Sequence, residues 1–408
     1  MATLESLPNE MLEIVCNHLS SEVSQDSRAC KALYSLSLTS KRLHSTAQPH
    51  LYNHIDTGTC NLVSLVQTLC LRPDLAALIK IVHLRSTRGY IVTEELVEFL
   101  RLHVKHAFTE DYCAELKKIL TYPPRLRMEK ERFHSILLLY LPKVEEIIFY
   151  TNENQFADWY ARPHLYGQWP YGATVMPCLK NLHEVVARRA SIVKSGRLQA
   201  IIEASAVESY TTSSPGAFRT FCPRFELPLK HLDITCGHLD FEGTKPVFLL
   251  NCGKLERLSI TCTYFCPLWF RTRQMQRLVD AICETNSVKK LQYLHLNMRD
   301  DGRESQTDLR HKVNVDFRPE RFLSLKSMGV NMWLIEERRS YLTKLPQTIE
   351  DLNVYGSSAK TSVYKEKYID QMFQDAESIA LQYPNLQTIQ YWDDTIKGNR
   401  LMRQMDLK

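Results

Sequence analysis

The segment Leu229-Lys230-His231-Leu232-Asp233-Ile234 carries the pattern that decides the fold: an apolar residue, two variable residues, an apolar residue, one variable residue and an apolar residue. The same spacing begins again at residues 255, 291, 325, 349 and 386, and weaker copies begin at residues 79, 144 and 182. Alternation of apolar and variable residues over a short segment is typical of a β-strand with one buried face. The recurrence predicts a chain built from many short strands of one kind.

Helical patterns occupy some of the intervals between these strands. The strong copies begin 24 to 37 residues apart, and apolar residues at helical spacing occur in residues 62–69, 274–283 and 365–382. Strands that alternate with helices pair in parallel through right-handed crossovers. The sequence therefore predicts a parallel-stranded α/β array over residues 57–400, with residues 401–408 as a C-terminal tail.

Residues 1–56 show a different pattern and are expected to form a separate module of three short helices. Pro8 suits the first turn of a helix, and apolar residues recur at helical spacing from residue 7 to residue 19. A second helix is expected around residues 32–36. Ser40 can cap a third, which Pro49 is expected to end. So small a module buries little apolar area and gains stability by docking on a partner.

The motifs of this module resemble the F-box family. They are Leu7-Pro8-x-Glu10 with apolar positions up to Leu19, then Leu36-x-Leu38-x-Ser40-Lys41-Arg42-Leu43, and finally Leu51-Tyr52. Leu43 stands where the family usually has tryptophan, and residues 22–28 lengthen the first connection. The resemblance implies docking onto the small adaptor subunit of an SCF-type cullin-RING ubiquitin ligase, and through it onto the cullin. The adaptor-binding residues carried over from the family are Leu7, Pro8, Ile14, Leu19, Leu36, Leu38 and Leu43.

The strand pattern resembles leucine-rich repeats, and an F-box followed by such repeats is a known architecture. Leucine-rich repeats are about 20–29 residues long, so several intervals here are stretched. The family places Asn or Cys three residues after the last strand leucine, where this chain has Gly237, Thr263 and Arg299. The implied fold class is α/β: an N-terminal three-helix F-box followed by an irregular leucine-rich-repeat-like solenoid with parallel strands. An unrelated α/β domain with a coincidental strand pattern is the alternative.

The parallel strands of a solenoid line one concave face, and the residues between the apolar positions point outward on it. These positions are polar and mostly uncharged, which suits a protein partner held by hydrogen bonds and a few aromatic rings. A solvated face without a partner is the alternative. The predicted substrate-binding residues are Asp233, Thr235, Ser259, Thr261, His295, Asn297, Asn331, Asn353, Tyr355, Gln390 and Trp392.

Composition argues against several classes of protein. The chain has 408 residues, 44% apolar and 24% charged, which is ordinary for a globular protein. A net charge of +5, from 51 basic and 46 acidic residues, gives no electrostatic case for nucleic acid or a membrane surface. No apolar run approaches the roughly 20 residues that span a bilayer. The 12 cysteines form no CxxC pair, which favours a reduced compartment, cytoplasmic or nuclear.

Motifs of catalysis and cofactor binding are weak. The sequence lacks the glycine-rich phosphate and dinucleotide motifs, the serine-hydrolase motif and the paired-histidine zinc motif, so no cofactor is predicted. Cys236, Cys252, Cys262 and Cys266 match no standard zinc spacing and are expected to be buried apolar residues, so no metal is predicted. Residues 150–177, rich in aromatic rings, and residues 299–318, rich in charge, are expected to form loops.

The sequence thus predicts a non-catalytic substrate-recognition subunit of an SCF-type ubiquitin ligase, with an unknown target protein. An F-box scaffold that serves assembly without degradation is the alternative. An enzyme with an unrecognised site, for example one built on Asp158 and His164 in the aromatic segment, is a more remote one.

Overall fold

The computed structural model of the chain forms two compact units, which we describe separately. Unit 1 comprises Met1–Arg188 and Ala204–Ala206, and unit 2 comprises Arg189–Glu203 and Val207–Lys408. The residues that the structure describes are 4–22, 27–85, 99, 102, 137–138, 140–150, 181–188, 207–213, 227–236, 249, 252–262, 268–298, 315–331, 345–357, 370, 373–374, 379, 381–395 and 398–407.

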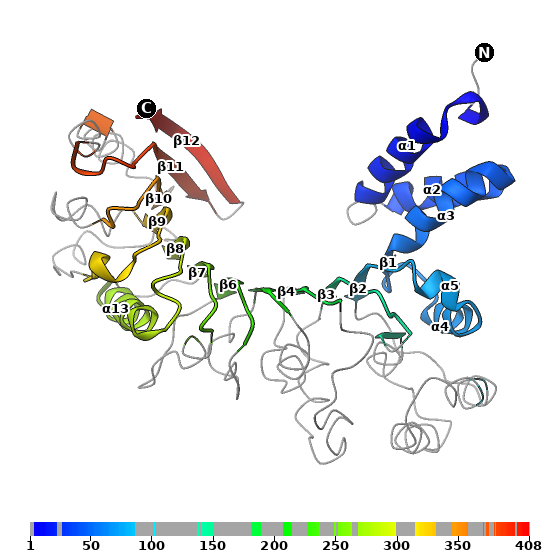
Figure 1. Cartoon of the computed structure of the whole chain (residues 1–408), viewed down its shortest axis with the longest axis horizontal. Coiled ribbons are helices and arrows are strands. Elements are labelled where there is room, and N and C mark those ends of the chain that lie inside the picture. The colour runs from blue at the N-terminus through cyan, green and yellow to red at the C-terminus, as the bar shows by residue number, and fades with distance from the viewer. Residues whose placement is uncertain are drawn as a thin grey trace. The chain divides into compact units, whose positions relative to one another are not determined.

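Unit 1 begins with a helical module, which contains the three helices that the sequence predicts (Figure 1). One side chain from each helix meets in the module's core: Cys16, Leu33 and Ala47. Ser40 caps the third helix, because its hydroxyl accepts a hydrogen bond from the Leu43 amide at 3.3 Å. The elements are the short 3-10 helix η1 (Leu4–Ser6), α1 (Asn9–Glu22), α2 (Ser27–Thr39) and α3 (Lys41–Asn53).

The prediction that Pro49 ends the third helix is wrong, because α3 continues to Asn53. Proline removes the donor to the carbonyl four residues earlier, which belongs to Ser45. Both Ser45 and Pro49 are exposed, so that carbonyl can bond to water. Leu51, beyond the proline, packs against the module's core. Packing of the last turn therefore outweighs the cost of the proline.

The strands of unit 1 pair in parallel and in chain order. They are β1 (His54–Asp56), β2 (Ile81–Arg85), β3 (Glu146–Tyr150) and β4 (Glu184–Arg188). Helices α4 (Leu62–Leu71) and α5 (Pro73–Ala76) connect β1 to β2 (Figure 1). Asn61 caps α4 by accepting from the amides of Val63 and Ser64. β1 was not predicted, and it lies inside the residues that the sequence assigned to the helical module.

The strands of unit 2 also follow chain order, and every pair is parallel except the last. α13 (Leu268–Glu284) connects β7 to β8, and the short helix η5 (Pro319–Arg321) precedes β9 (Figure 1). The strands are β5 (Ser209–Ser213), β6 (His231–Cys236), β7 (Arg257–Cys262), β8 (Tyr293–Met298), β9 (Ser327–Asn331), β10 (Asp351–Ser357), β11 (Thr388–Thr395) and β12 (Gly398–Asp406).

β12 runs antiparallel to β11, so the predicted C-terminal tail is wrong: residues 401–406 belong to a strand. Arg403 explains why this polar segment is held. Its guanidinium lies 4.4 Å from the centre of the Phe373 ring, and Nη1 lies 2.6 Å from an Asp370 oxygen. β12 thus covers the last parallel strand with a charged edge, a common protection for the end of a sheet.

Each strand of unit 2 from β6 to β11 begins with the same backbone contact. The Glu208 carbonyl accepts hydrogen bonds from the amides of Lys230 and His231 at 2.8 and 2.9 Å. In the same way, the Lys230 carbonyl accepts from the first two amides of the next repeat, and the pattern continues strand by strand. We call the first residue of each contact an entry residue. The entry residues are Lys230, Glu256, Gln292, Lys326, Glu350 and Gln387. Lysine and glutamate pair at this level, with Lys230 to Glu208 at 2.7 Å and Lys326 to Glu350 at 3.0 Å.

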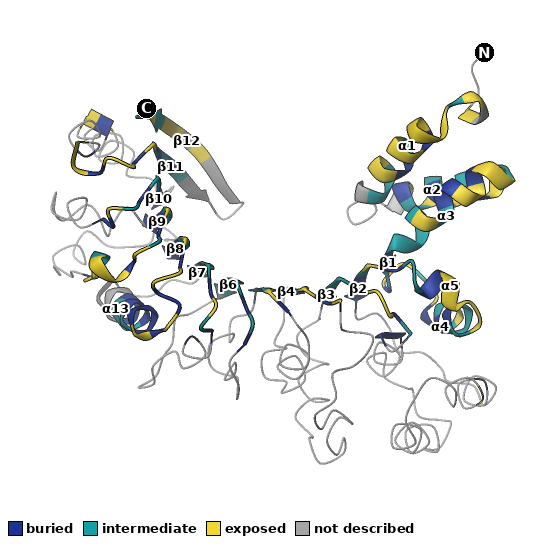
Figure 2. Ribbon diagram, in the orientation of Figure 1, coloured by how far each residue is buried: buried dark blue, intermediate teal, exposed yellow. Residues whose placement is uncertain are grey.

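The repeated strand pattern is confirmed wherever the structure describes it. Each of the nine predicted copies has its second and third apolar positions in a strand, β2–β4 and β6–β11. The apolar positions form the core, since Leu229, Leu232 and Ile234 are 0%, 1% and 3% exposed (Figure 2). The chain is therefore an α/β protein with mostly parallel strands. The three loop positions at residues 237, 263 and 299, and nearly all of both predicted loops, lie outside the described residues.

Candidate functional site

The helical module has exposed residues along α1 and α2 (Figure 2), and several of them are apolar. On α1, Leu12 is buried, whereas Met11 and Ile14 are 47% and 61% exposed. On α2, Tyr34 and Leu38 are 55% and 67% exposed. Residues three or four apart lie on the same side of a helix, so each pair forms an apolar stripe. We call Met11, Ile14, Tyr34 and Leu38 the module surface. Exposed apolar side chains at helical spacing are typical of surfaces that bind a partner.

The predicted adaptor-binding residues divide into three groups by burial. Ile14, Leu38 and Pro8 are exposed, and Leu7 is half-buried. Leu19 and Leu36 are half-buried, because they pack against the module's core.

Leu43 is the correction among these residues. It is 3% exposed, since it faces inward from α3, and its side chain is therefore part of the module's interior and not of its surface. The structure adds Met11 and Tyr34, which the sequence prediction missed. Their positions, three residues before Ile14 and four before Leu38, would have indicated them.

In unit 2 the strand register brings the predicted substrate-binding residues onto one face, which we call the polar face. Asp233 lies beside Ser259, and Ser259 beside His295. Gly329 separates His295 from Asn353, which lies beside Gln390. Two residues further along the strands, a second row continues on the same face: Thr235, Thr261 and Asn297, then Asn331, Tyr355 and Trp392.

His295 lies at the centre of an aromatic cluster on the polar face. Its ring stacks on Tyr293 with centroids 3.9 Å apart, and Tyr355 approaches edge-on at 5.7 Å. The Tyr355 hydroxyl lies 2.7 Å from Nδ1 of His295, and the Tyr293 hydroxyl lies 2.8 Å from it. The guanidinium of Arg257 lies over the Tyr293 ring, 4.1 Å from its centroid. Each ring of the cluster therefore contacts at least one other member.

Burial and charge keep the His295 ring neutral. Burial first, and then the positive charge of Arg257, lower the pKa of His295 from 6.5 to about 3. The hydroxyls of Tyr293 and Tyr355 both approach the same ring nitrogen, Nδ1. Burial also raises the pKa of Asp233, although the Ser259 hydroxyl and Arg257 act to lower it.

Trp392 is a half-exposed aromatic residue of the polar face, as is Tyr293. Its indole nitrogen donates to the side-chain oxygen of Asn353 at 2.8 Å, which fixes the ring plane. Gln390 donates to Gln404 of β12 at 3.1 Å, and Thr388 donates to Asp351 at 2.6 Å. The exposed part of this face therefore includes orientated hydrogen-bonding groups beside the aromatic ring of Trp392.

Four predicted substrate-binding residues are buried, and the expectation that they point freely outward is wrong: His295, Asn297, Asn353 and Tyr355. They lie on the predicted side of the sheet, but the rings of Tyr293 and Tyr355 contact His295, and Trp392 contacts Asn353. Asp233, Thr235, Ser259, Thr261, Gln390 and Trp392 are half-buried and keep part of their surface available. The side chain of Asn331 lies outside the described residues.

Arg257 and Tyr293 are polar-face residues that the sequence prediction missed. They precede Ser259 and His295 by two positions, so the period of two along a strand places them on the same side. Extending the pattern by one step toward the start of each strand would have found them.

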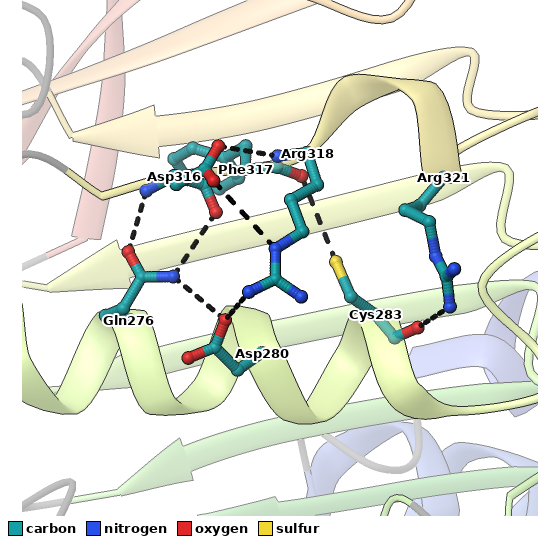
Figure 3. A network of polar contacts seen from close by, with 7 residues as sticks. All are labelled: Gln276, Asp280, Cys283, Asp316, Phe317, Arg318 and Arg321. Atoms are coloured by element: carbon teal, nitrogen blue, oxygen red, sulfur yellow. Dashed lines mark hydrogen bonds and ion pairs between the residues drawn. The ribbon is translucent and has the colours of Figure 1, made fainter.

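A second polar network joins α13 to the segment before β9 (Figure 3). The amide of Asp316 donates to the side-chain oxygen of Gln276 at 2.7 Å, and Arg318 donates to Asp280 at 3.0 Å. Arg321 donates to the Cys283 carbonyl at 2.9 Å. Each of these hydrogen bonds joins a residue of α13 to the segment before β9, so the network holds the helix against that segment.

The described residues carry no group of three or more potential metal ligands. Within the same ranges, no helix combines the length and the apolar character needed to cross a bilayer. Comparison of the sequence with known proteins gives no match, neither to a family model nor, at a significant level, to a curated protein.

Proposed function

We propose that this chain is the substrate-recognition subunit of an SCF-type ubiquitin ligase. Exposed apolar stripes inside motifs that resemble the F-box support the proposal most directly. Ile14 and Leu38 are 61% and 67% exposed within those motifs, although the same helices have a well-packed inner side. Apolar side chains at helical spacing are what a helical adaptor surface would bury.

The polar face of unit 2 is the proposed target-binding surface. It offers side chains that donate hydrogen bonds, side chains that accept them, and a half-exposed tryptophan. Tryptophan is enriched at the centres of protein interfaces. The chain would act by bringing the target's lysines close to the ubiquitin-conjugating enzyme, so its contribution is proximity. Such a role belongs in the cytoplasm or the nucleus, where these ligases act.

Binding of the purified SCF adaptor subunit tests the first half of the proposal. We expect Ile14→Asp and Leu38→Asp each to weaken adaptor binding by about ten- to a hundredfold. Burying such a side chain contributes about 1.5–3 kcal/mol, and each 1.4 kcal/mol changes the dissociation constant about tenfold. Isothermal titration calorimetry on the full chain gives the dissociation constants.

The matched control is Leu381→Asp, which places the same charge at a leucine of unit 2 that is 87% exposed. This variant should bind the adaptor like the wild type. Absence of adaptor binding in the wild-type chain, or equal binding by the Ile14→Asp variant, would refute the proposed docking.

A further inference from the structure

We infer that Arg42 is a positioning residue: it holds Leu7 and Pro8, at the start of α1, in the orientation that the adaptor recognises. The inference rests on the proposed function. Arg42 is the second residue of α3, and its side chain reaches back 33 and 35 positions in the sequence. Its Nη2 donates to the Leu7 carbonyl at 2.6 Å, and both Nη2 and Nε donate to the side-chain oxygen of Asn9, at 2.8 and 2.9 Å.

These contacts bridge the segment on which the predicted docking begins. Leu7 is bonded locally, through its amide to the Leu4 carbonyl at 3.2 Å, and Pro8 has no amide hydrogen to donate. The guanidinium connects both sides of the proline at once, through the carbonyl of Leu7 and the side chain of Asn9. Arginine suits this role, because its donors form a rigid planar fork.

A second contact between the same helices shows why Arg42 acts on position and not on folding. The Nε2 of His50 lies 2.7 Å from Glu13, one turn further along α1. Leu12 and Cys16, on the inner side of α1, are buried independently of either contact. Loss of Arg42 therefore leaves α1 packed and releases only its first turn, next to Met11 of the module surface.

The test is the affinity of the full chain for the purified SCF adaptor subunit. We expect Arg42→Ala to weaken binding about tenfold, because the adaptor must then order the released first turn of α1 as it binds. The melting temperature should stay close to that of the wild type. The control is Arg72→Ala, because Arg72 is an exposed arginine paired with the nearby Asp74 at 2.6 Å. This control should bind normally.

Asn9 variants separate positioning from a direct contact. Asn9→Asp keeps the acceptor and should keep the affinity, whereas Asn9→Leu should weaken binding. In the Arg42→Ala background, Asn9→Leu should cause no further loss, because both residues belong to one connection. Additive losses, or wild-type affinity in Arg42→Ala, would overturn the inference.

Hydrogen exchange distinguishes failure of this inference from failure of the proposed function. In the free protein, Arg42→Ala should speed exchange of the amides in residues 7–12 and leave the strands of unit 2 unchanged. If the wild type does not bind the adaptor, the proposed function falls. Unchanged exchange in residues 7–12 overturns the positioning role, whether or not the adaptor binds.

Discussion

The imidazole of His295 fits beside β9 because residue 329 is a glycine. A Cβ added to Gly329 would lie 2.7 Å from Cγ of His295, closer than real Cβ atoms come. The ring has little room to retreat, since Tyr293 stacks on it at 3.9 Å and the Tyr355 hydroxyl contacts Nδ1 at 2.7 Å. The centre of the polar face therefore depends on one missing side chain.

We predict that Gly329→Ala lowers the free energy of unfolding by about 1–3 kcal/mol, the usual cost of overpacking. Urea denaturation of the full chain measures it. The control is the same substitution in a His295→Ala background, where the added Cβ no longer meets the imidazole and should cost less. An equal loss in both backgrounds would contradict the explanation.

The sequence of a strand predicts on which face of the sheet a side chain lies, but not how far that side chain is buried. The period of two placed His295, Asn353 and Tyr355 on the correct face, because it is a property of each strand alone. Their burial depends on neighbours that are remote in sequence, such as the contact between His295 and Tyr355, 60 residues apart. The helical spacing of Leu43 and Ala47 points both residues inward, and their burial agrees with it; only the family motif names Leu43 as a docking residue.

At the level of elements, the segment before β9 contains a residue with an unusual backbone conformation. Arg318 has φ 44° and ψ 63°, the left-handed conformation, which costs a residue with a side chain about 1–2 kcal/mol. The ion pair of its guanidinium with Asp280 at 3.0 Å ties the turn to α13 (Figure 3). Burial raises the pKa of the Cys283 thiol in the same network to about 11, so this cysteine stays protonated.

We predict that Arg318→Ala destabilises the protein more than Arg318→Gly does. Both variants lose the ion pair, but glycine adopts the left-handed conformation freely. The difference should be about 1 kcal/mol in chemical denaturation. If Arg318→Ala is more stable than Arg318→Gly, the backbone at residue 318 is not strained.

The strong strands were predictable because their three apolar positions recur at fixed spacing, and α4 and α13 because their apolar residues follow a period of 3.6. β5 was missed because its last core position is the polar residue Thr212, in the segment Val207-x-x-Tyr210-x-Thr212. β1 is only three residues long, and β12 is held by Arg403 on Phe373 rather than by an apolar stripe. Contacts of that kind leave no periodic trace in a sequence.

For the whole molecule, the proposed function assigns the two binding tasks to separate parts of the chain. The module surface lies in unit 1, and the polar face lies on β6–β11 of unit 2. Adaptor binding and target binding therefore require different residues, and a substitution in one surface should leave binding at the other unchanged.

We predict that Trp392→Ala loses the target protein and keeps the adaptor, whereas Ile14→Asp loses the adaptor and keeps the target. Removal of the half-exposed indole takes away the largest ring available on the polar face, with its Asn353 contact of 2.8 Å. Quantitative mass spectrometry of complexes purified from cells measures both losses. Joint loss of adaptor and target in both variants would contradict the division of tasks.

The entry residues let the chain vary its length without losing its register. Each strand is aligned by amides of its own first residues on the carbonyl of the previous entry residue, and not by the segment that leads to it. Insertions and deletions in the connecting segments therefore change the outline of the protein while the buried rows stay aligned. This freedom explains how intervals as different as 24 and 37 residues coexist in one array.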